Sequence, residues 1–314
     1  MELTDITKID PEVPKQCYFE HGMKALAYKK HFWLNVWPKK WSAEFGKRPD
    51  WYGNDNDIDI AGWYKSWREE FTARSDDVIV AAYPKAGHTW LNEVVPMILN
   101  NTTTSRNMSK MFRFIEQKSM EELEAMPSQR FLLTHFPYHH MSQDVFDKGS
   151  KIVYLYRNPK DTAVSLYHHM KDMKAYYGFE GDWNDFFPFV LSGLHQEGKW
   201  IENVISWWKN GKNNPNILFI SYEQMKKDFV GNAKRLAAFL GKSYDDEFYN
   251  RLQQSCSVKS MKKLTALDIA GLNPVRKGEI GDWKNYFTLA QSQQYEALYQ
   301  PVLDQHKDLI IEYE

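Results

Sequence analysis

Four short apolar runs constrain the fold of this chain more than any other feature. They cover residues 78–83, 131–134, 151–156 and 217–221. Each run is too short for a helix, and each is followed by a longer segment with helical periodicity, such as 233–240 with Gly241 as a C-terminal stop. Short apolar strands that alternate with helices are typical of a parallel sheet covered on both faces. We therefore predict an α/β fold with a central, mostly parallel sheet flanked by helices.

Nothing in the chain separates one domain from another. We find no internal repeat, no low-complexity tract and no long Pro/Gly/Ser linker in the 314 residues. Six of the 12 tryptophans fall between Trp33 and Trp67, several of them at helical spacing. We predict one compact unit, in which an aromatic-rich N-terminal segment (residues 1–62) packs on an α/β domain (residues 63–314). The alternative is that one or two of these tryptophans line a substrate pocket.

Composition excludes several classes of protein. A hydrophobic content of 43% is that of a globular chain, and a net charge of -1 predicts no strong attraction to nucleic acid or anionic membranes. Cys17 and Cys256 belong to no Cys-x-x-Cys pair, so a disulfide framework or a cysteine zinc site is not expected. No signal peptide and no apolar stretch of roughly 18 residues is found. We predict a cytoplasmic protein.

Parallel sheets bind their ligands at the carboxyl ends of their strands, so the residues just past each apolar run are candidates for a site. These residues are the segment 84–90, His135, Arg157 and Tyr222. In the first segment, Lys85, Gly87 and Thr89 lie between a strand and a helix, where backbone N–H groups and the helix N-terminus can hold a phosphate. The turn is P-loop-like, although the strict P-loop pattern is absent. A tight turn with a solvated lysine is the alternative.

Two further segments carry groups suited to anions. Arg157 ends a strand and Ser165 lies about two turns along the next helix, so a forked guanidinium and a hydroxyl can share one phosphate. The alternative is a structural salt bridge between Arg157 and Asp161. In Arg276-Lys277-Gly278-Glu279-Ile280-Gly281, two adjacent cations and two glycines form a loop that can close over an anion. A solvated basic surface is the alternative there.

Taken together and in order, these motifs identify a family. Tyr-Pro-Lys-x-Gly-x-Thr-Trp, Arg-Asn-x-Lys-Asp-x-Ala-Val-Ser and Arg-Lys-Gly-x-x-Gly-Asp-Trp-Lys-Asn resemble the cytosolic sulfotransferases, and the likeness runs over about residues 66–288. The resemblance implies transfer of a sulfuryl group from 3′-phosphoadenosine 5′-phosphosulfate (PAPS) to a hydroxyl or amine of a small, aromatic or hydrophobic acceptor. The product of the donor is 3′-phosphoadenosine 5′-phosphate (PAP). No metal is implied, and no nucleic-acid or membrane partner.

The resemblance also implies roles for individual residues. His135 is the general base, and Lys85 stabilises the oxygen that leaves the sulfur. Donor-binding residues are Lys85, Ala86, Gly87, His88, Thr89, Trp90, Arg157, Ser165, Tyr222, Cys256, Val258, Met261, Arg276, Lys277 and Gly278, and acceptor-binding residues are Phe114, Phe136 and His169. The residues themselves support these roles, because two separate anion sites match a donor with phosphates at two ends of its ribose. An alcohol acceptor also needs a base that is neutral near pH 7.

The chain departs from the family pattern at four places. Leu133 replaces the usual lysine two residues before the histidine, which removes a cation from beside the reacting group. His88 stands where a hydroxyl residue is usual and could bind an anion when protonated, and Val258 replaces an aromatic residue opposite Trp90. The segment 263–276 is shorter than in many relatives and the family's dimer motif is absent, so both a monomer and a homodimer stay open.

Two alternatives to an active sulfotransferase follow from these observations. A catalytically impaired module that binds PAPS or PAP is motivated by Leu133. A P-loop nucleotide kinase or NTPase is favoured only by the first motif, and it lacks the Gly-Lys-Ser/Thr pair and a strand-end aspartate for Mg²⁺.

Overall fold

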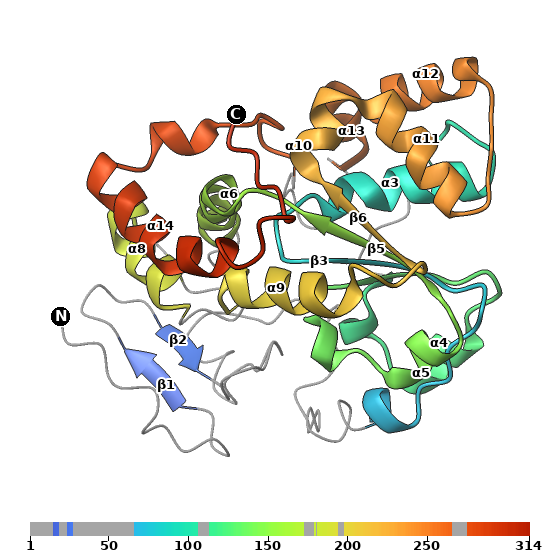
Figure 1. The fold of residues 1–314 in the computed structure, drawn as a ribbon, viewed down its shortest axis with the longest axis horizontal. Helices are drawn as coiled ribbons and strands as arrows, with labels where there is room; N and C mark the ends of the chain where they lie inside the picture. The colour runs from blue at the N-terminus through green and yellow to red at the C-terminus, as the bar shows by residue number, and fades with distance from the viewer. Residues whose placement is uncertain are drawn as a thin grey trace.

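The centre of the protein is a four-stranded parallel sheet. The computed structural model describes residues 66–105, 113–172, 179, 181–193, 198–265 and 275–314, together with the backbone of two short antiparallel strands, β1 (Lys15–Tyr18) and β2 (Lys24–Ala27). The sheet has the order β4-β3-β5-β6 and consists of β3 (Val78–Ala82), β4 (Phe131–Thr134), β5 (Lys151–Tyr156) and β6 (Ile217–Ser221) (Figure 1). The predicted α/β fold and all four predicted strands are confirmed. The predicted boundary at residue 62 lies outside the described residues.

The register of the sheet brings all four carboxyl ends to one edge. Ala81 of β3 pairs with Thr134 of β4, Ala82 pairs with Leu155 of β5, and Tyr156 of β5 pairs with Ser221 of β6. The residues that follow the strands are therefore neighbours in space, although they are far apart in the sequence.

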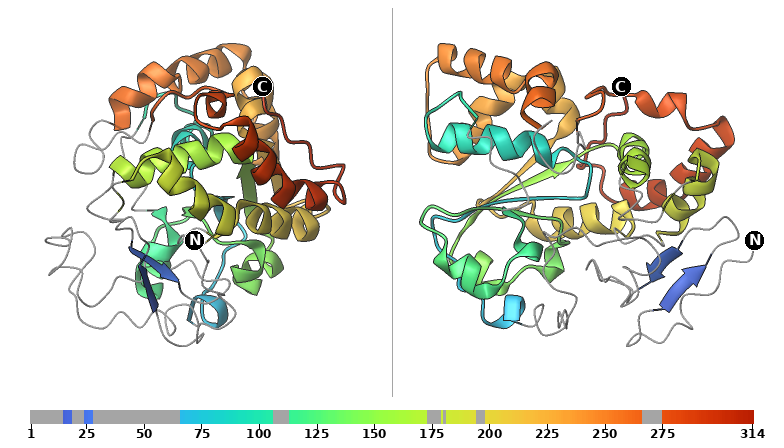
Figure 2. Two further views of the ribbon diagram at one scale, coloured as in Figure 1. Left: turned by 90° about the vertical axis from the view of Figure 1, so that its left-hand side faces the viewer. Right: turned by 180° about the vertical axis from the view of Figure 1, so that it is seen from behind.

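Helices cover both faces of the sheet, as the two views of Figure 2 show. One face carries α3 (His88–Leu99), α10 (Tyr222–Lys227), α11 (Phe229–Phe239), α12 (Asp246–Ser255) and α13 (Val258–Thr265). The other carries α6 (Pro159–Asp172), α8 (Trp183–Ser192), α9 (Trp200–Gly211) and α14 (Leu289–Leu303). Residues of β3 alternate between the two cores, since Val78 and Val80 lie in one and Ile79 and Ala81 in the other.

Short elements complete the described chain. They are α4 (Met120–Ala125), α5 (Gln143–Asp147), η4 (Ile115–Gln117), η5 (Tyr138–His140) and η6 (Asp282–Asn285). The amino-terminal edge of the sheet is held by a fully buried ion pair, in which Arg130 Nε donates to Asp77 Oδ1 at 2.7 Å. Loss of either partner would leave an uncompensated buried charge and destabilise the protein.

Candidate active site

The turn between β3 and α3 forms an anion cradle at the sheet edge. Lys85 and Gly87 both have positive φ, of 67° and 124°, and α3 begins directly after them at His88. Gly87 is the N-cap of α3 and no side chain caps the helix, so the first N–H groups face the turn. A Cβ at Gly87 would lie 3.0 Å from side-chain atoms of both Leu155 and Tyr222. Glycine is therefore required here for its conformation and for close packing.

Arg157 leaves the end of β5 and is fixed by the C-terminal loop. Its guanidinium carbon lies 4.3 Å from the ring centroid of Tyr222, and its Nη2 donates to the carbonyl oxygen of Glu279 at 2.9 Å. The Nε atom of Arg157 is buried and has no hydrogen-bond partner among the described residues. A buried guanidinium N–H without a partner is costly, and a bound anion would satisfy it.

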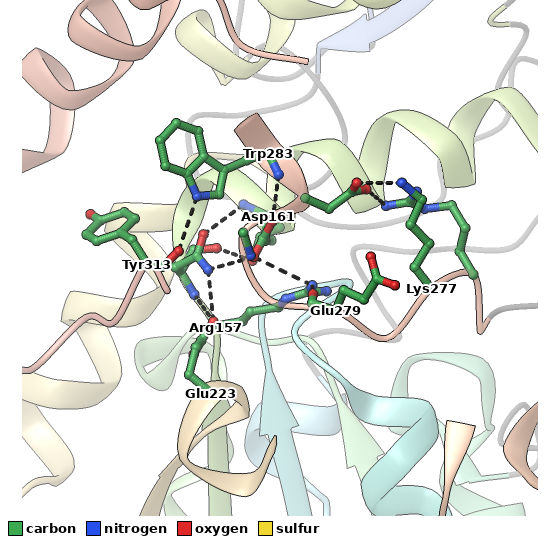
Figure 3. A network of polar contacts seen from close by, with 12 residues as sticks. Arg157, Asp161, Glu223, Lys277, Glu279, Trp283 and Tyr313 are labelled. Atoms are coloured by element: carbon green, nitrogen blue, oxygen red, sulfur yellow. Dashed lines mark hydrogen bonds and ion pairs between the residues drawn. The ribbon is translucent and has the colours of Figure 1, made fainter. Parts of the chain in front are cut away.

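Asp161 anchors the loop that lies over Arg157. Its two carboxylate oxygens accept from the backbone N–H groups of Gly281 at 2.8 Å and Trp283 at 2.9 Å, as Figure 3 shows. The salt bridge between Arg157 and Asp161 that the sequence offered as an alternative is present but loose, at 3.9 Å. Asp161 thus acts chiefly on the backbone of the loop, 120 residues away in sequence.

Removing this anchor gives a first testable prediction. Asp161→Ala leaves two N–H groups of the loop without an acceptor, at a cost of about 1–3 kcal/mol each. We expect a lower Tm and at least about tenfold weaker PAP binding, measured by differential scanning fluorimetry and calorimetry. Asp172→Ala is the matched control because Asp172 is exposed on the same helix. Equal PAP affinity in the two variants would contradict the anchoring role.

The two cations of the loop share one carboxylate. Arg276 forms an ion pair with Asp282, and Lys277 Nζ donates to the same side chain at 2.5 Å. Burial alone would raise the pKa of Asp282, but the hydrogen bonds from Lys277 and Arg276 lower it to about 2. Gly278 follows with φ of 69°, and a Cβ there would lie 2.6 Å from Val258 Cγ2. The loop is therefore closed against the start of α13.

Aromatic side chains lie beside the cradle. The Trp90 ring is 5.5 Å from that of Tyr222 and stacks on Phe229 at 5.8 Å, and its buried Nε1 has no hydrogen-bond partner in the described chain. Two predicted nucleotide contacts lie deeper. Cys256 and Met261 are 3% and 2% exposed, and burial raises the pKa of the Cys256 thiol to about 12, so it stays protonated. Among these residues, Trp90, Tyr222 and Val258 are gathered around the cradle and the loop.

His135 follows β4 directly and is held from three sides. Its Nδ1 lies 2.8 Å from the carbonyl oxygen of Ala82, its backbone N–H donates to Glu116 Oε1 at 2.6 Å, and its carbonyl accepts from Asn203 Nδ2 at 3.1 Å. A carbonyl oxygen only accepts, so Nδ1 carries the hydrogen and Nε2 is the basic nitrogen of the neutral ring. This is the tautomer that a general base with its Nε2 toward a substrate requires.

The side chain of His88 lies with His135 rather than beside Arg157. The two rings are 4.3 Å apart, and His88 Nε2 lies 3.2 Å from the carbonyl oxygen of Val80. Phe114 contacts both rings, at 5.5 Å from His88 and 4.7 Å from His135. The structure thus groups His88 and Phe114 with His135.

The other predicted acceptor residues lie in different surroundings. Phe136 is 1% exposed and packs in the core against Trp67 at 6.0 Å, while His169 is half-buried on α6.

Two other residues singled out in the sequence are Ser165 and Leu133. Ser165 is half-buried on α6, one turn beyond Asp161. Leu133 is fully buried in the core that also contains Phe114.

Sequence reasoning missed three carboxylates. Asp161 and Asp282 lie inside the motifs, but the sequence does not show what they contact. Asp161 anchors the C-terminal loop, and Asp282 is the counter-ion of Arg276 and Lys277. Glu116 carries no sequence signal, yet it accepts from both Thr134 Oγ1 at 2.8 Å and the His135 N–H.

Within the described residues, no three His, Cys, Asp or Glu side chains cluster as a metal site would need. None of the helices described there has the length and apolarity to cross a bilayer.

Comparisons with known proteins show the family of this chain. The model of the sulfotransferase domain matches residues 75–307. Sulfotransferase 1B1 of the dog, Canis lupus familiaris, is 34% identical over 252 residues, which cover 74% of this chain and 84% of the relative. Human sulfotransferase 1C2 is 32% identical over 251 residues, which cover 74% of this chain and 84% of the human protein.

Solved structures give the same result. Mouse sulfotransferase SULT7A1 complexed with PAP is 34% identical and has a TM-score of 0.66, covering 75% of this chain and 87% of the mouse chain. Retinol dehydratase in complex with androsterone and PAP is 25% identical and has a TM-score of 0.70. The match covers 81% of this chain and 87% of the retinol dehydratase chain. A domain match over most of the chain, relatives above 30% identity and a shared fold lead to one conclusion: this chain belongs to the sulfotransferase family and is a sulfotransferase.

Proposed function

We propose that this protein transfers a sulfuryl group from PAPS to a hydroxyl, or an amine, of a small aromatic or hydrophobic acceptor, with His135 as the general base. The observation that carries the proposal is the hydrogen bond from His135 Nδ1 to the Ala82 carbonyl, which makes Nε2 the basic nitrogen of the neutral ring. The base lies at the same sheet edge as the anion cradle, so donor and acceptor can meet there.

The residues at the cradle fit PAPS. Within the described residues, the buried Arg157 Nε and Trp90 Nε1 have no hydrogen-bond partner. Both side chains contact the ring of Tyr222, and their N–H groups suit a nucleotide with phosphate groups. The turn at Lys85 and Gly87 would hold the 5′-phosphosulfate, and Arg157, Ser165 and the loop 276–278 would hold the 3′-phosphate. PAP in the structures of two relatives supports this donor.

The reaction is an in-line displacement at sulfur. The acceptor oxygen attacks the sulfur while His135 Nε2 takes its proton, and the bond between sulfur and the bridging oxygen of the 5′-phosphate breaks. The electron pair of that bond stays on the phosphate, which leaves as PAP. Lys85 stabilises the charge that gathers there, and the proton on His135 is later lost to solvent. A fixed cation at such a position contributes about 10²–10³ in rate.

The acceptor side is apolar. Phe114, 5% exposed, contacts the ring of His135, and an aromatic neighbour of the base suits an aromatic or hydrophobic alcohol. We infer that His169 and Phe136 contribute to this side. We infer that the protein acts in the cytoplasm, where a free thiol such as that of Cys256 stays reduced.

A thermal-shift titration followed by a turnover assay tests this function. We expect PAP to raise the Tm by mass action, and PAPS to be consumed when phenols and hydrophobic alcohols are supplied. A Tm that PAP does not change would overturn the assignment of the donor. ATP with Mg²⁺ is the control, because a nucleotide kinase would respond to it.

A catalytically impaired PAPS or PAP module is the second candidate. It is favoured by Leu133, since a buried leucine stands where relatives place a cation near the reacting group. The same assay separates the two: a PAP-dependent rise in Tm without sulfated product over the whole acceptor panel would favour the module.

A further inference from the structure

Glu116 reaches the backbone of the proposed base from a separate element. It belongs to η4, which follows Phe114, and its Oε1 accepts from the His135 N–H at 2.6 Å and from Thr134 Oγ1 at 2.8 Å. Thr134 Oγ1 in turn accepts from the Phe136 N–H at 3.0 Å. One carboxyl group therefore holds the chain at three successive residues where it leaves β4.

The second oxygen of Glu116 makes no such bond. Its Oε2 is shielded from solvent and has no hydrogen-bond partner in the part of the chain that the structure describes. Burial raises the pKa of Glu116 to about 7, against the lowering effect of its hydrogen bonds to His135 and Thr134. A glutamine would accept the same two hydrogen bonds without the cost of a buried charge, so the backbone contacts alone do not explain a carboxyl group.

The surroundings of Glu116 suggest what a charge does there. His135 donates its backbone N–H to the carboxyl, and His88 of α3 faces the His135 ring at a centroid distance of 4.3 Å. Lys85, in the turn before α3, is the cation that the proposed function assigns to the donor. A base that accepts a proton becomes cationic, and a nearby negative charge favours that state.

We propose that Glu116 is a positioning residue for the transfer reaction: it fixes the peptide of His135 at the end of β4, and its charge stabilises the imidazolium that forms when His135 takes the acceptor proton. This inference rests on the proposed function. Glu116 would act like the third group that orients a general base in other enzymes, except that it contacts the backbone of the histidine and not its ring.

Glu116→Gln tests the charge separately from the hydrogen bonds. Without the carboxylate the imidazolium is less favoured, so we expect the acidic limb of the kcat/KM profile to move down by about one pH unit. We also expect kcat on the plateau to fall about tenfold, with the KM for PAPS and the Kd for PAP unchanged. Glu121→Gln is the matched control, because Glu121 is exposed on the neighbouring helix α4.

Stability supplies a readout that does not depend on turnover. A carboxyl whose pKa rises to about 7 on folding binds a proton more tightly in the folded state, so it lowers stability as pH rises from its ordinary pKa to 7. The Tm of the wild type should fall across this window relative to that of Glu116→Gln. If the glutamine variant does not fold, Glu116→Asp replaces it: it keeps a charge, so the acidic limb should stay in place while kcat falls.

The outcomes separate the inference from the proposed function. Wild-type turnover together with a folded Glu116→Gln variant of unchanged pH profile and kcat would overturn the role of Glu116 alone. So would a Glu116→Asp variant whose acidic limb moves down. A wild type that binds PAP but transfers no sulfuryl group would overturn the proposed function, and this inference with it.

Discussion

His135→Ala should reduce turnover by about 10²–10⁴-fold, which is the contribution of a general base. An alcohol oxygen is a poor nucleophile while it keeps its proton, and alanine leaves nothing at the end of β4 to take that proton. The affinity for PAP should stay within about twofold, because Arg157 and the C-terminal loop are held by Tyr222, Glu279 and Asp161 and not by this side chain. Initial rates with a phenol acceptor and calorimetric titration with PAP measure the two quantities.

His139→Ala is the control for this variant, since His139 is an exposed histidine four residues away. It should retain wild-type rates. Near-normal turnover in His135→Ala would refute the role of His135 as the base. Loss of PAP binding in His135→Ala, with an unchanged Tm, would show instead that the histidine belongs to the donor site.

Arg157→Ala should weaken PAP binding by about 10²-fold. Arg157 is 8% exposed and its guanidinium rests on Tyr222, so a phosphate bound to it would be largely out of water. Loss of one partner of a buried charge pair costs about 2–5 kcal/mol. The backbone is expected to stay in place, because Trp200 Nε1 donates to the Arg157 carbonyl rather than to its side chain. Titration calorimetry with PAP measures the change.

Two variants make this result specific. Arg157→Lys keeps the positive charge but lacks the forked N–H donors of the guanidinium, so it should recover only part of the affinity for PAP. Arg251→Ala removes an exposed arginine of α12 and should bind PAP as the wild type does. If Arg157→Ala bound PAP normally, the side chain would serve only to hold the loop through Glu279, and the 3′-phosphate would have to bind elsewhere.

The sequence predicted the parts of the fold that depend on local pattern. Apolar runs at residues 78–83 and 131–134 became buried strands, and the α11 helix (Phe229–Phe239) ends before Gly241, whose φ of 72° explains the stop. Parallel sheets bind ligands at the carboxyl ends of their strands. This principle predicts at which end of the strands the candidate site lies, even when the order of the strands is not known.

The rest of the site depends on contacts between distant segments. Nothing in the residues around Asp161 reveals that its oxygens meet Gly281 and Trp283, because the folding of the C-terminal loop over α6 brings them together. Glu116 was missed for the same reason. The direction of the His88 ring, toward Val80 and His135, is likewise set by tertiary packing and could not be read from its place in the motif.

The pairing of Arg276 and Lys277 with Asp282 has a consequence for selectivity in the cell. A bare pair of cations would attract every abundant phosphate compound, and inorganic phosphate or ATP would then compete for the donor site that we propose. The Asp282 carboxylate offsets one of these two positive charges, so an anion that binds the loop has to compete with Asp282 for the same two side chains.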